Sequence, residues 1–415
     1  MIVIGLISGT SADGIDAAVA DVSLEDDRIR LEPLGQRSVD YPDELRDALW
    51  DALPPTDAGP EELCRLDALL GQAFGHAAAE ANADLAGGRA ELVTSHGQTI
   101  HHWVDDAGTA RGTLQLGQPA WIAQTTGLPV VADLRNRDIA VGGHGAPLVA
   151  YPDVLLLADR AGETSSSGGG ATGGGETSSS GGGASGGDAH ALLNIGGIAN
   201  LTLRRADGTA LAFDTGPGNA LMDAAVTDQT DGAERIDGDG KRAGRGRVDP
   251  GLLEALLRDP YYAQPAPKST GKERFHRDYL AGFLADAPDV DGDDVIATLA
   301  ALTAETIARA AAEHGVVELI ASGGGTANPV LMEELRTRAT GVAVRTIDDL
   351  GVPSGAKEAY WFAVLGFCTL HGIPGTVASC TGASQASLLG HLTPGADGFP
   401  ATDRVEPPVG MRIVT

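Results

Sequence analysis

The stretch IGLISGTSADGIDAAVADV, residues 4–22, decides how the chain begins to fold. It starts as an apolar strand, passes through a loop rich in hydroxyl groups, and becomes strand-like again. A β-hairpin needs only a tight turn, and Asp13-Gly14 is sufficient for one. Turn formation therefore leaves Ser8-Gly9-Thr10-Ser11 and the acidic Asp16 without an explanation.

The same loop carries groups that suit a phosphate chain. The backbone N–H groups of Gly9 to Ser11, with the hydroxyls of Thr10 and Ser11, are able to surround phosphate oxygens as an anion-binding nest does. Asp13 or Asp16 is able to hold a hydrated magnesium ion, which prefers carboxylate oxygen. The stretch has no GxxxxGK[ST] pattern and no lysine, which excludes a P-loop. The alternative is a hairpin with a polar loop and no ligand.

Composition limits the classes of function. The chain has 415 residues, of which 42% are apolar, enough for two or three domains with real cores. Its formal net charge of −28 argues against partners such as nucleic acid or an anionic membrane, because both require basic patches. Lysine occurs at only four positions, and acidic residues crowd surface-type stretches. This balance favours a protein adapted to high salt, with an ordinary acidic protein as the alternative.

Cellular location follows from what the sequence lacks. No apolar run approaches the roughly 18 residues of a membrane span. The first residues read as a strand and not as a signal peptide. The three cysteines, Cys64, Cys368 and Cys380, have neither metal-ligand nor disulfide spacing. We expect a cytoplasmic protein.

The organisation along the chain predicts an α/β architecture with a duplication. Strand-like and helix-like runs alternate on both sides of a Gly/Ser-rich segment, residues 163–188, which contains ETSSSGGGA twice and reads as a flexible insertion without chemistry. Residues 4–22 and 192–208 both read as strand, glycine turn, strand. Residues 92–99 and 319–326 both read as apolar strand, Ser, glycine loop, Thr. Two matches in the same order indicate duplicated domains with ligand loops beyond the strand ends.

Two motifs of the second half are candidates for catalysis and nucleotide binding. In FDTGPGN, Asp214 ends a short apolar run, which is where a general base is wanted; an acid that only satisfies its own turn is the alternative. In ASGGGTANP, the glycines Gly323, Gly324 and Gly325 precede a helix and allow close approach of an anionic ligand. Ordinary turns use glycine as well, so this loop alone is weak evidence.

Polar groups that suit a sugar substrate follow strands of the first half. His96 and Gln98 offer donors for sugar hydroxyls, as does His144. Arg135 and Arg137 are suited to bidentate binding of a carboxylate. A metal site from His96 and its neighbours His101 and His102 is disfavoured, because no acidic or cysteine partner stands at ligand spacing. Glu358 opens a helix, where an acid is favoured by the helix dipole alone.

Taken together, these motifs resemble those of the anhydro-N-acetylmuramic acid kinases. The resemblance spans nearly the whole chain in the right order, and it is carried by GLISGTSADGIDAAVADV, SHGQTIHH, QLGQPAWIAQTTGLPVVADLRNRDIAVGGHGAPLV, LLNIGGIANLT, FDTGPGNALMDA, ASGGGTANPVLMEEL and KEAYWFAVLGF. One position departs from the pattern, because His144 stands where the family commonly carries Gln.

The resemblance implies a duplicated actin-like (ribonuclease H-like) ATPase fold with two lobes around a central nucleotide and substrate cleft. The expected lobes are residues 1–160 and 189–415, separated by the insertion at 161–188, with the C-terminal helix packing back toward the first lobe. It implies ATP and Mg²⁺ as cofactors. It places the nucleotide against Gly9, Thr10, Ser11, Asp13, Gly14, Asp16, Gly323, Gly324 and Gly325.

The resemblance also implies the reaction. Water opens the 1,6-anhydro bond of the sugar while the freed 6-oxygen takes the γ-phosphoryl group of ATP, giving N-acetylmuramic acid 6-phosphate. Asp214 matches the general base. Arg137 and Glu358 match substrate-side positions, and we expect His96 and Gln98 beside them. Which carboxylate positions the metal is left open.

Two other functions stay open from the sequence. One is a kinase of another anhydro- or amino sugar, and the other is a nucleotide-gated binding protein like actin or a chaperone. The concentration of polar side chains at strand ends favours a small polar substrate over a polymer contact. ATP turnover that depends on added anhydrosugar separates the kinase from the binding protein. The sequence allows a homodimer without specifying one.

The charge balance makes a first prediction. A net charge of −28 repels itself over a Debye length of about 8 Å at 0.15 M salt and about 3 Å at 1 M. We expect the melting temperature in molar potassium chloride to exceed that in dilute buffer, measured by differential scanning fluorimetry. A melting temperature that stays flat or falls with salt would remove the high-salt interpretation.

Overall fold

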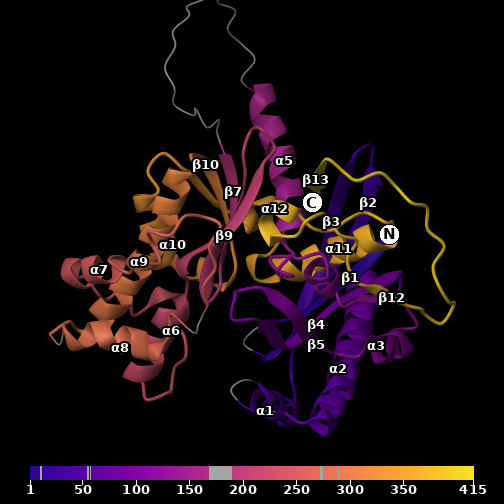
Figure 1. The fold of residues 1–415 in the computed structure, drawn as a ribbon, viewed down its shortest axis with the longest axis horizontal. Coiled ribbons are helices and arrows are strands. Elements are labelled where there is room, and N and C mark those ends of the chain that lie inside the picture. Colours follow the sequence, from indigo (N-terminus) through magenta and orange to yellow (C-terminus); the bar gives the residue numbers. More distant parts are fainter. Residues whose placement is uncertain (10–11, 54–55, 57, 168–188, 272–273, 288) are drawn as a thin grey trace, which may run out of the picture. The chain divides into compact units, whose positions relative to one another are not determined.

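The chain folds into two compact units. The computed structural model describes residues 1–9, 12–53, 56, 58–167, 189–271, 274–287 and 289–415 (Figure 1). Unit 1 contains residues 1–156 and 350–415, and unit 2 contains residues 157–349. Residues 350–415, which the expectation placed in the second lobe with a C-terminal helix packing back toward the first, group with unit 1. Helix α5 (Ala150–Ser167) extends into the expected insertion, whose residues 168–188 lie outside the described part of the chain.

Unit 1 is built on an eight-stranded mixed sheet. Its order is β12-β6-β4-β1-β2-β3-β13, with β5 paired to β4 off this path. The opening stretch forms β1 and β2, which pair antiparallel from Ile2 opposite Asp21 to Ile7 opposite Asp16. The strands are β1 (Ile2–Ser8), β2 (Gly14–Glu25), β3 (Arg28–Asp40), β4 (Leu92–Val104), β5 (Ala110–Leu116), β6 (Val130–Ala132), β12 (His391–Thr393) and β13 (Gly410–Ile413).

Unit 2 repeats the central part of this sheet. Its five strands have the order β11-β10-β7-β8-β9, and they are β7 (Ala189–Ile195), β8 (Ile198–Arg204), β9 (Ala210–Pro217), β10 (Val316–Ser322) and β11 (Ala343–Thr346). In both sheets the first strand pairs antiparallel with the second and parallel with the fourth. The fourth strand also has a second parallel partner, which is β6 for β4 in unit 1 and β11 for β10 in unit 2. The predicted α/β fold and its duplication are therefore confirmed by the strand topology.

Helices cover the two faces of the sheet in unit 1. The apolar side chains of Ile4 and Leu6 on β1 join a buried cluster with Leu70 and Phe74 of α2 (Pro60–Ala86). The opposite face receives α11 (Lys357–Leu370), whose backbone comes so close that a Cβ on Gly5 would lie 1.9 Å from the carbonyl oxygen of Ala359. The remaining helices of this unit are α1 (Asp43–Ala52), α3 (Pro119–Thr126), α4 (Asn136–Ile139) and α12 (Ala378–Thr381).

The core of unit 2 is organised around one long helix. Helix α9 (Gly292–Glu313) buries most of its length in a cluster that also contains the alternate β7 residues Ala191, Leu193 and Ile195. It is the one helix in the described residues that is long and apolar enough to cross a membrane, and 78% of that stretch is buried inside the protein. Such burial is typical of a core helix. Around it lie α6 (Ala220–Gln229), α7 (Pro250–Leu257), α8 (Arg277–Ala285) and α10 (Pro329–Arg338).

A buried acid of unit 2, Glu318, forms hydrogen bonds that link β10 to α5 and to β7. The carboxylate of Glu318 on β10 accepts hydrogen bonds from Arg160 at 2.8 Å and 3.2 Å and lies 3.1 Å from Nδ1 of His190 on β7. Hydrogen bonding from His190 and then Arg160 lowers the pKa of Glu318 to about 2. A carboxylate whose pKa is lowered in the folded state stabilises the fold above its ordinary pKa. That stabilisation is lost as the pH falls from about 4.5 toward 2.

We predict that Glu318→Gln lowers the free energy of unfolding at neutral pH by about 1–2 kcal/mol, with allowance for solvent screening. The difference from wild type should shrink as the pH falls from 4.5 to 2, because over that range the carboxylate binds a proton in the unfolded state before it does so in the folded state. Urea unfolding at a series of pH values measures both. Glu254→Gln, which breaks the exposed pair with Arg258, is the matched control and should have little effect. A constant difference across this pH range would contradict the prediction.

Candidate active site

The loop between β1 and β2 is fixed at its base by buried hydrogen bonds. Ser8 ends β1 opposite Gln98 of β4, and its hydroxyl lies 2.5 Å from Oε1 of Gln98 and 2.7 Å from the carbonyl oxygen of Gly14. Nε2 of Gln98 donates to the carbonyl oxygens of Gly9 at 3.3 Å and Thr99 at 3.2 Å. Gln98 therefore acts as a clamp between the loop and β4. Its predicted role in binding substrate stays a prediction.

The far end of the loop is tied to β3 and to the segment that follows it. The backbone N–H of Ala12 donates to the carbonyl oxygen of Gly9, and the backbone N–H of Tyr41 donates to the backbone carbonyl oxygen of Asp13. A Cβ on Gly14 would lie 2.6 Å from the carbonyl oxygen of Val39, so only glycine allows the β2–β3 pairing at this point. Thr10 and Ser11, predicted to bind phosphate, lie outside the described residues.

Two carboxylates stand at this loop. Asp13 is exposed, and Asp16 is half-buried and accepts a hydrogen bond from Ser38 at 2.5 Å. Burial raises the pKa of Asp16, and the nearby charge of Asp13 adds to that effect. A divalent cation would relieve this repulsion, and Mg²⁺ on a nucleotide needs only one or two protein carboxylates. The pair therefore fits the predicted Mg²⁺. In the described residues, no group of three or more His, Cys, Asp or Glu side chains is arranged for a metal ion.

His96 is fixed in one tautomer by its neighbours. Its Nε2 accepts a hydrogen bond from Nε of Arg135 at 2.9 Å, so Nδ1 carries the proton and donates to the carbonyl oxygen of Gly97 at 3.0 Å. Burial, followed by the charge of Arg135, lowers the pKa of His96 to about 3, which keeps the ring neutral. The ring also packs against Phe362 of α11 at 4.9 Å between centroids. His96 thus holds Arg135, and its predicted contact with substrate stays a prediction.

Glu358 lies in the first turn of α11 among charged groups. Burial raises its pKa, and the cations of Lys357 and Arg135 oppose that shift while the charges of Asp153 and Asp16 reinforce it. The charge of Glu358 therefore interacts with those of Asp16 on β2 and of Arg135. Beside it, the buried Lys357 donates to Asp153 at 3.2 Å, and Trp361 donates to the same oxygen at 2.6 Å. These contacts fix the start of α11.

The two arginines after β6 differ in what they contact. Besides the bond to His96, Arg135 donates to the carbonyl oxygen of Gly145 at 2.6 Å. Arg137 on α4 is exposed. Arg135 is therefore held by hydrogen bonds to other protein groups. Of the two arginines, Arg137 is the one whose side chain is accessible to a carboxylate.

Asp214 lies in unit 2, on β9. Its neighbours Phe213 and Thr215 line a cavity of about 260 Å³ beside α9, whereas Asp214 projects from the opposite side of the strand. Oδ2 of Asp214 accepts hydrogen bonds from the backbone N–H of Thr270 at 2.8 Å and from the hydroxyl of Ser269 at 3.1 Å. The predicted base therefore has an oriented carboxylate.

The loop that supplies these donors was missed by the sequence reasoning. It belongs to the run PAPKSTGKE, residues 265–273, which joins a hydroxyl pair and a glycine to two of the four lysines in the chain. That concentration of rare lysines was the signal available in the sequence. Nothing in its spacing connects the run to a residue some fifty positions earlier.

The three glycines after β10 have different surroundings. A Cβ on Gly323 would lie 2.6 Å from Oδ1 of Asn194, and a Cβ on Gly325 would lie 2.3 Å from Cγ2 of Ile195. Both positions are therefore glycine because the loop packs on the end of β7. Gly324 is exposed and a Cβ there would meet nothing within 4 Å, so it is the member of the triplet open to a ligand. Asn328 caps α10 immediately afterwards.

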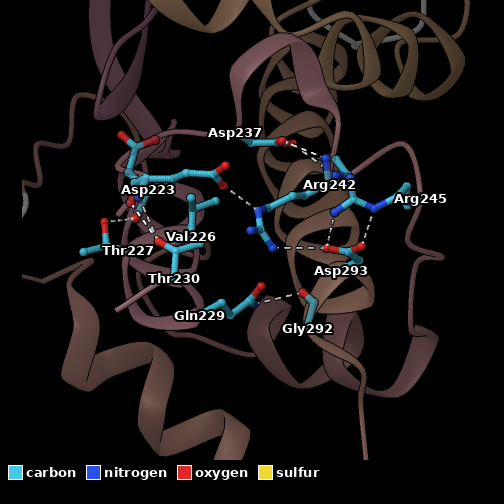
Figure 2. Close-up of polar contacts among 12 residues, drawn as sticks. Asp223, Val226, Thr227, Gln229, Thr230, Asp237, Arg242, Arg245, Gly292 and Asp293 are labelled. Carbon is cyan, nitrogen blue, oxygen red and sulfur yellow. Dashed lines mark hydrogen bonds and ion pairs between the residues drawn. The ribbon is translucent and has the colours of Figure 1, made fainter. Parts of the chain in front are cut away.

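A second polar loop of unit 2 packs against this cap. Gly240 contacts Asn328, and Figure 2 shows the ion pairs that hold the loop to the start of α9. Arg242 and Arg245 both reach the carboxylate of Asp293, at 3.6 Å and 2.7 Å. The backbone N–H of Arg242 donates to Asp237 at 2.8 Å. A cavity of about 340 Å³ lies over this loop, lined by Glu234, Arg235, Ile236, Asp237, Gly238, Lys241, Arg242 and Arg245.

Comparison with known proteins identifies the family. The family model described as anhydro-N-acetylmuramic acid kinase matches residues 1–170 and 184–395. A protein of that name from Streptomyces coelicolor is 53% identical, over 100% of this chain and 99% of its own length. One from Streptomyces avermitilis is 52% identical, over 98% of each chain.

Similarity to solved structures is much more distant. The activator of 2-hydroxyisocaproyl-CoA dehydratase from Clostridium difficile, with bound ADPNP, is 10% identical with a TM-score of 0.39, over 88% of this chain and 94% of its own. The fold assignment thus rests on the strand topology, and the family on the sequence relatives. The chain belongs to the anhydro-N-acetylmuramic acid kinase family.

Proposed function

We propose that this protein is an ATP-dependent kinase that opens 1,6-anhydro-N-acetylmuramic acid with water and phosphorylates the 6-oxygen, giving N-acetylmuramic acid 6-phosphate. The observation that carries the proposal is the family match over nearly the whole chain, at 53% identity to a relative of that name. The held carboxylate of Asp214 and the loop clamped by Ser8 and Gln98 support it.

In the proposed reaction Asp214 is the general base. It takes a proton from a water molecule, whose oxygen attacks the anomeric carbon of the sugar. The bond between that carbon and the 6-oxygen breaks, and the electron pair stays on the 6-oxygen. This oxygen then attacks the γ-phosphorus of ATP, and ADP leaves with the electron pair of the broken P–O bond. A positioned base of this kind contributes roughly 10²- to 10⁴-fold in rate.

The β1–β2 loop is the proposed site for the ATP phosphates, with Gly9, Thr10, Ser11 and Gly14 along them. Asp13 and Asp16 would hold Mg²⁺, which neutralises charge on the phosphates when bound. The fixed base of the loop supports this role, because phosphoryl transfer depends mainly on positioning. On unit 2, Gly323, Gly324 and Gly325 are the proposed nucleotide loop, with Gly324 as the exposed contact.

Arg137 and Glu358 are the proposed substrate residues of unit 1, with His96 and Gln98 behind them. N-acetylmuramic acid carries a lactyl carboxylate, and the exposed guanidinium of Arg137 suits it. The protein is proposed to act in the cytoplasm on this small sugar and not on nucleic acid or membranes, in line with its charge of −28.

We predict that Asp214→Asn lowers kcat by ~10²- to 10⁴-fold, equivalent to about 3–5 kcal/mol of barrier. Asn keeps the shape but cannot take a proton from water. The affinity for ATP, measured by calorimetry, should change little, because the phosphate loop belongs to unit 1. Asp207→Asn, in the exposed turn before β9, is the matched control and should keep normal turnover. A near-normal rate in the Asp214 variant would remove the base from the mechanism.

The reaction run in oxygen-18 water tests the same attack of water through the position of the label in the product. We expect the label at the anomeric hydroxyl and none in the transferred phosphate, because water attacks carbon and not phosphorus. Mass spectrometry of product quenched before anomeric exchange measures both positions. Label in the phosphate would overturn the proposed reaction.

Arg137→Ala should raise KM for the anhydrosugar about tenfold or more while KM for ATP stays within twofold, because a charge-assisted hydrogen bond to the carboxylate is lost. The anhydro form of N-acetylglucosamine, which lacks the lactyl carboxylate, should be used equally by wild type and variant. Arg111→Ala, at an exposed ion pair with Asp105, is the control. An equal loss for both sugars would show that Arg137 does not bind the carboxylate.

A further inference from the structure

Residues 261–270, here called the holding segment, contact Asp214 at several atoms. Contacts reach the aspartate at its main chain as well as at its carboxylate. The backbone N–H of Asp214 donates to the carbonyl oxygen of Lys268 at 2.9 Å, and the Tyr261 hydroxyl donates to the carbonyl oxygen of Asp214 at 2.8 Å. Burial raises the pKa of Tyr261, and the charge of Asp214 adds to it, so the phenol keeps the proton that it donates.

The holding segment is itself braced. Nζ of Lys268 donates to the carbonyl oxygens of Tyr261 and Tyr262, both at 3.1 Å, and lies 4.7 Å from the centre of the Tyr261 ring. The ring of Tyr261 packs edge-on against that of the fully buried Phe275. The two ends of the segment are therefore joined through Lys268. Because the segment is closed on itself, the donors at its C-terminal end have fixed positions.

Those donors meet one oxygen of the carboxylate. Oδ2 of Asp214 accepts from the Thr270 amide at 2.8 Å and from the Ser269 hydroxyl at 3.1 Å. With the backbone fixed as well, two donors on one oxygen define the plane of the carboxylate. Hydrogen bonds to a carboxylate also favour its ionised form. An ionised carboxylate in a fixed plane is the state in which a general base accepts a proton.

We infer that the Ser269 hydroxyl and the Thr270 amide are positioning groups that orient and ionise Asp214 for proton abstraction from water. This inference rests on the proposed function, because it assigns a purpose to contacts around the proposed base. Ser269 is exposed, so its hydroxyl contributes little to the packing of unit 2. Its removal should therefore change catalysis without changing stability.

Ser269→Ala tests the inference. We expect kcat to fall about tenfold, as for loss of a hydrogen bond to a charged group, while both KM values stay within twofold and the melting temperature is unchanged. The acidic limb of the pH–rate profile should move to higher pH, because the ionised carboxylate loses a donor. Ser269→Thr keeps the hydroxyl and should restore both quantities. Thr209→Ala removes the exposed hydroxyl bond to Asp207 at 2.7 Å and should match wild type.

A double-mutant cycle shows whether Ser269 acts through Asp214. On the Asp214→Asn background, Ser269→Ala should cause no further loss, because the group that it positions is gone. An equal loss with and without Asp214, or a normal rate and pH profile in Ser269→Ala, would overturn the inference.

A measurement without turnover separates this inference from the proposed function. In protein labelled with carbon-13 at the aspartate carboxyls, the Asp214 resonance is the one absent from Asp214→Asn. Its titration midpoint should move to higher pH in Ser269→Ala, and an unmoved midpoint would contradict the inference. Wild-type protein that fails to consume ATP with the anhydrosugar contradicts the proposed function alone, because the midpoint can still be measured.

Discussion

The close packing of α11 on β1 and β4 is the contact on which unit 1 depends. It requires glycine at two facing positions, since a Cβ on Gly5 would lie 1.9 Å from the Ala359 carbonyl oxygen and one on Gly366 would lie 1.6 Å from Oγ1 of Thr94. No rotamer change relieves the first contact, because it is made with backbone. This approach brings the N-terminus of α11 to the end of β1. Glu358 therefore lies among the charges of Asp16 and Arg135 because the helix packs there.

Duplication explains why the sheets of the two units have the same central topology while their loops differ. The strand order and directions are the same, so each unit has a turn after its first strand and another after its fourth. In unit 1 the turn after β1 spans residues 9–13, and Gln98 donates to the carbonyl oxygen of Gly9 at its start. In unit 2 the corresponding turn is shorter, and Asn194 and Ile195 beside it form the surface on which Gly323 and Gly325 pack. One scaffold thus supports two different kinds of loop.

Much of the fold could be predicted because it depends on local patterns. The apolar run of β1, the alternation of strands and helices and the two repeated turns all lie within short stretches. The grouping of residues 350–415 with unit 1 was not predictable in this way. It depends on the contact of Gly5 with Ala359, which lie more than 350 positions apart in the sequence.

The candidate site was predictable only as far as residue type reveals chemistry. Asp214, which follows a short apolar run, and the hydroxyl-rich loop stand out because those groups suit a base and phosphates. Spacing does not distinguish a residue that meets a ligand from one that holds another residue. His96 and Gln98 were singled out as substrate donors, yet their polar atoms engage Arg135, Ser8 and the backbone. Ser269 does not stand out in the sequence, although it donates a hydrogen bond to the proposed base, Asp214. Such hydrogen-bonded pairs form between residues that are far apart in the sequence. Only the folded structure therefore distinguishes a residue that contacts a ligand from one that holds another residue in place.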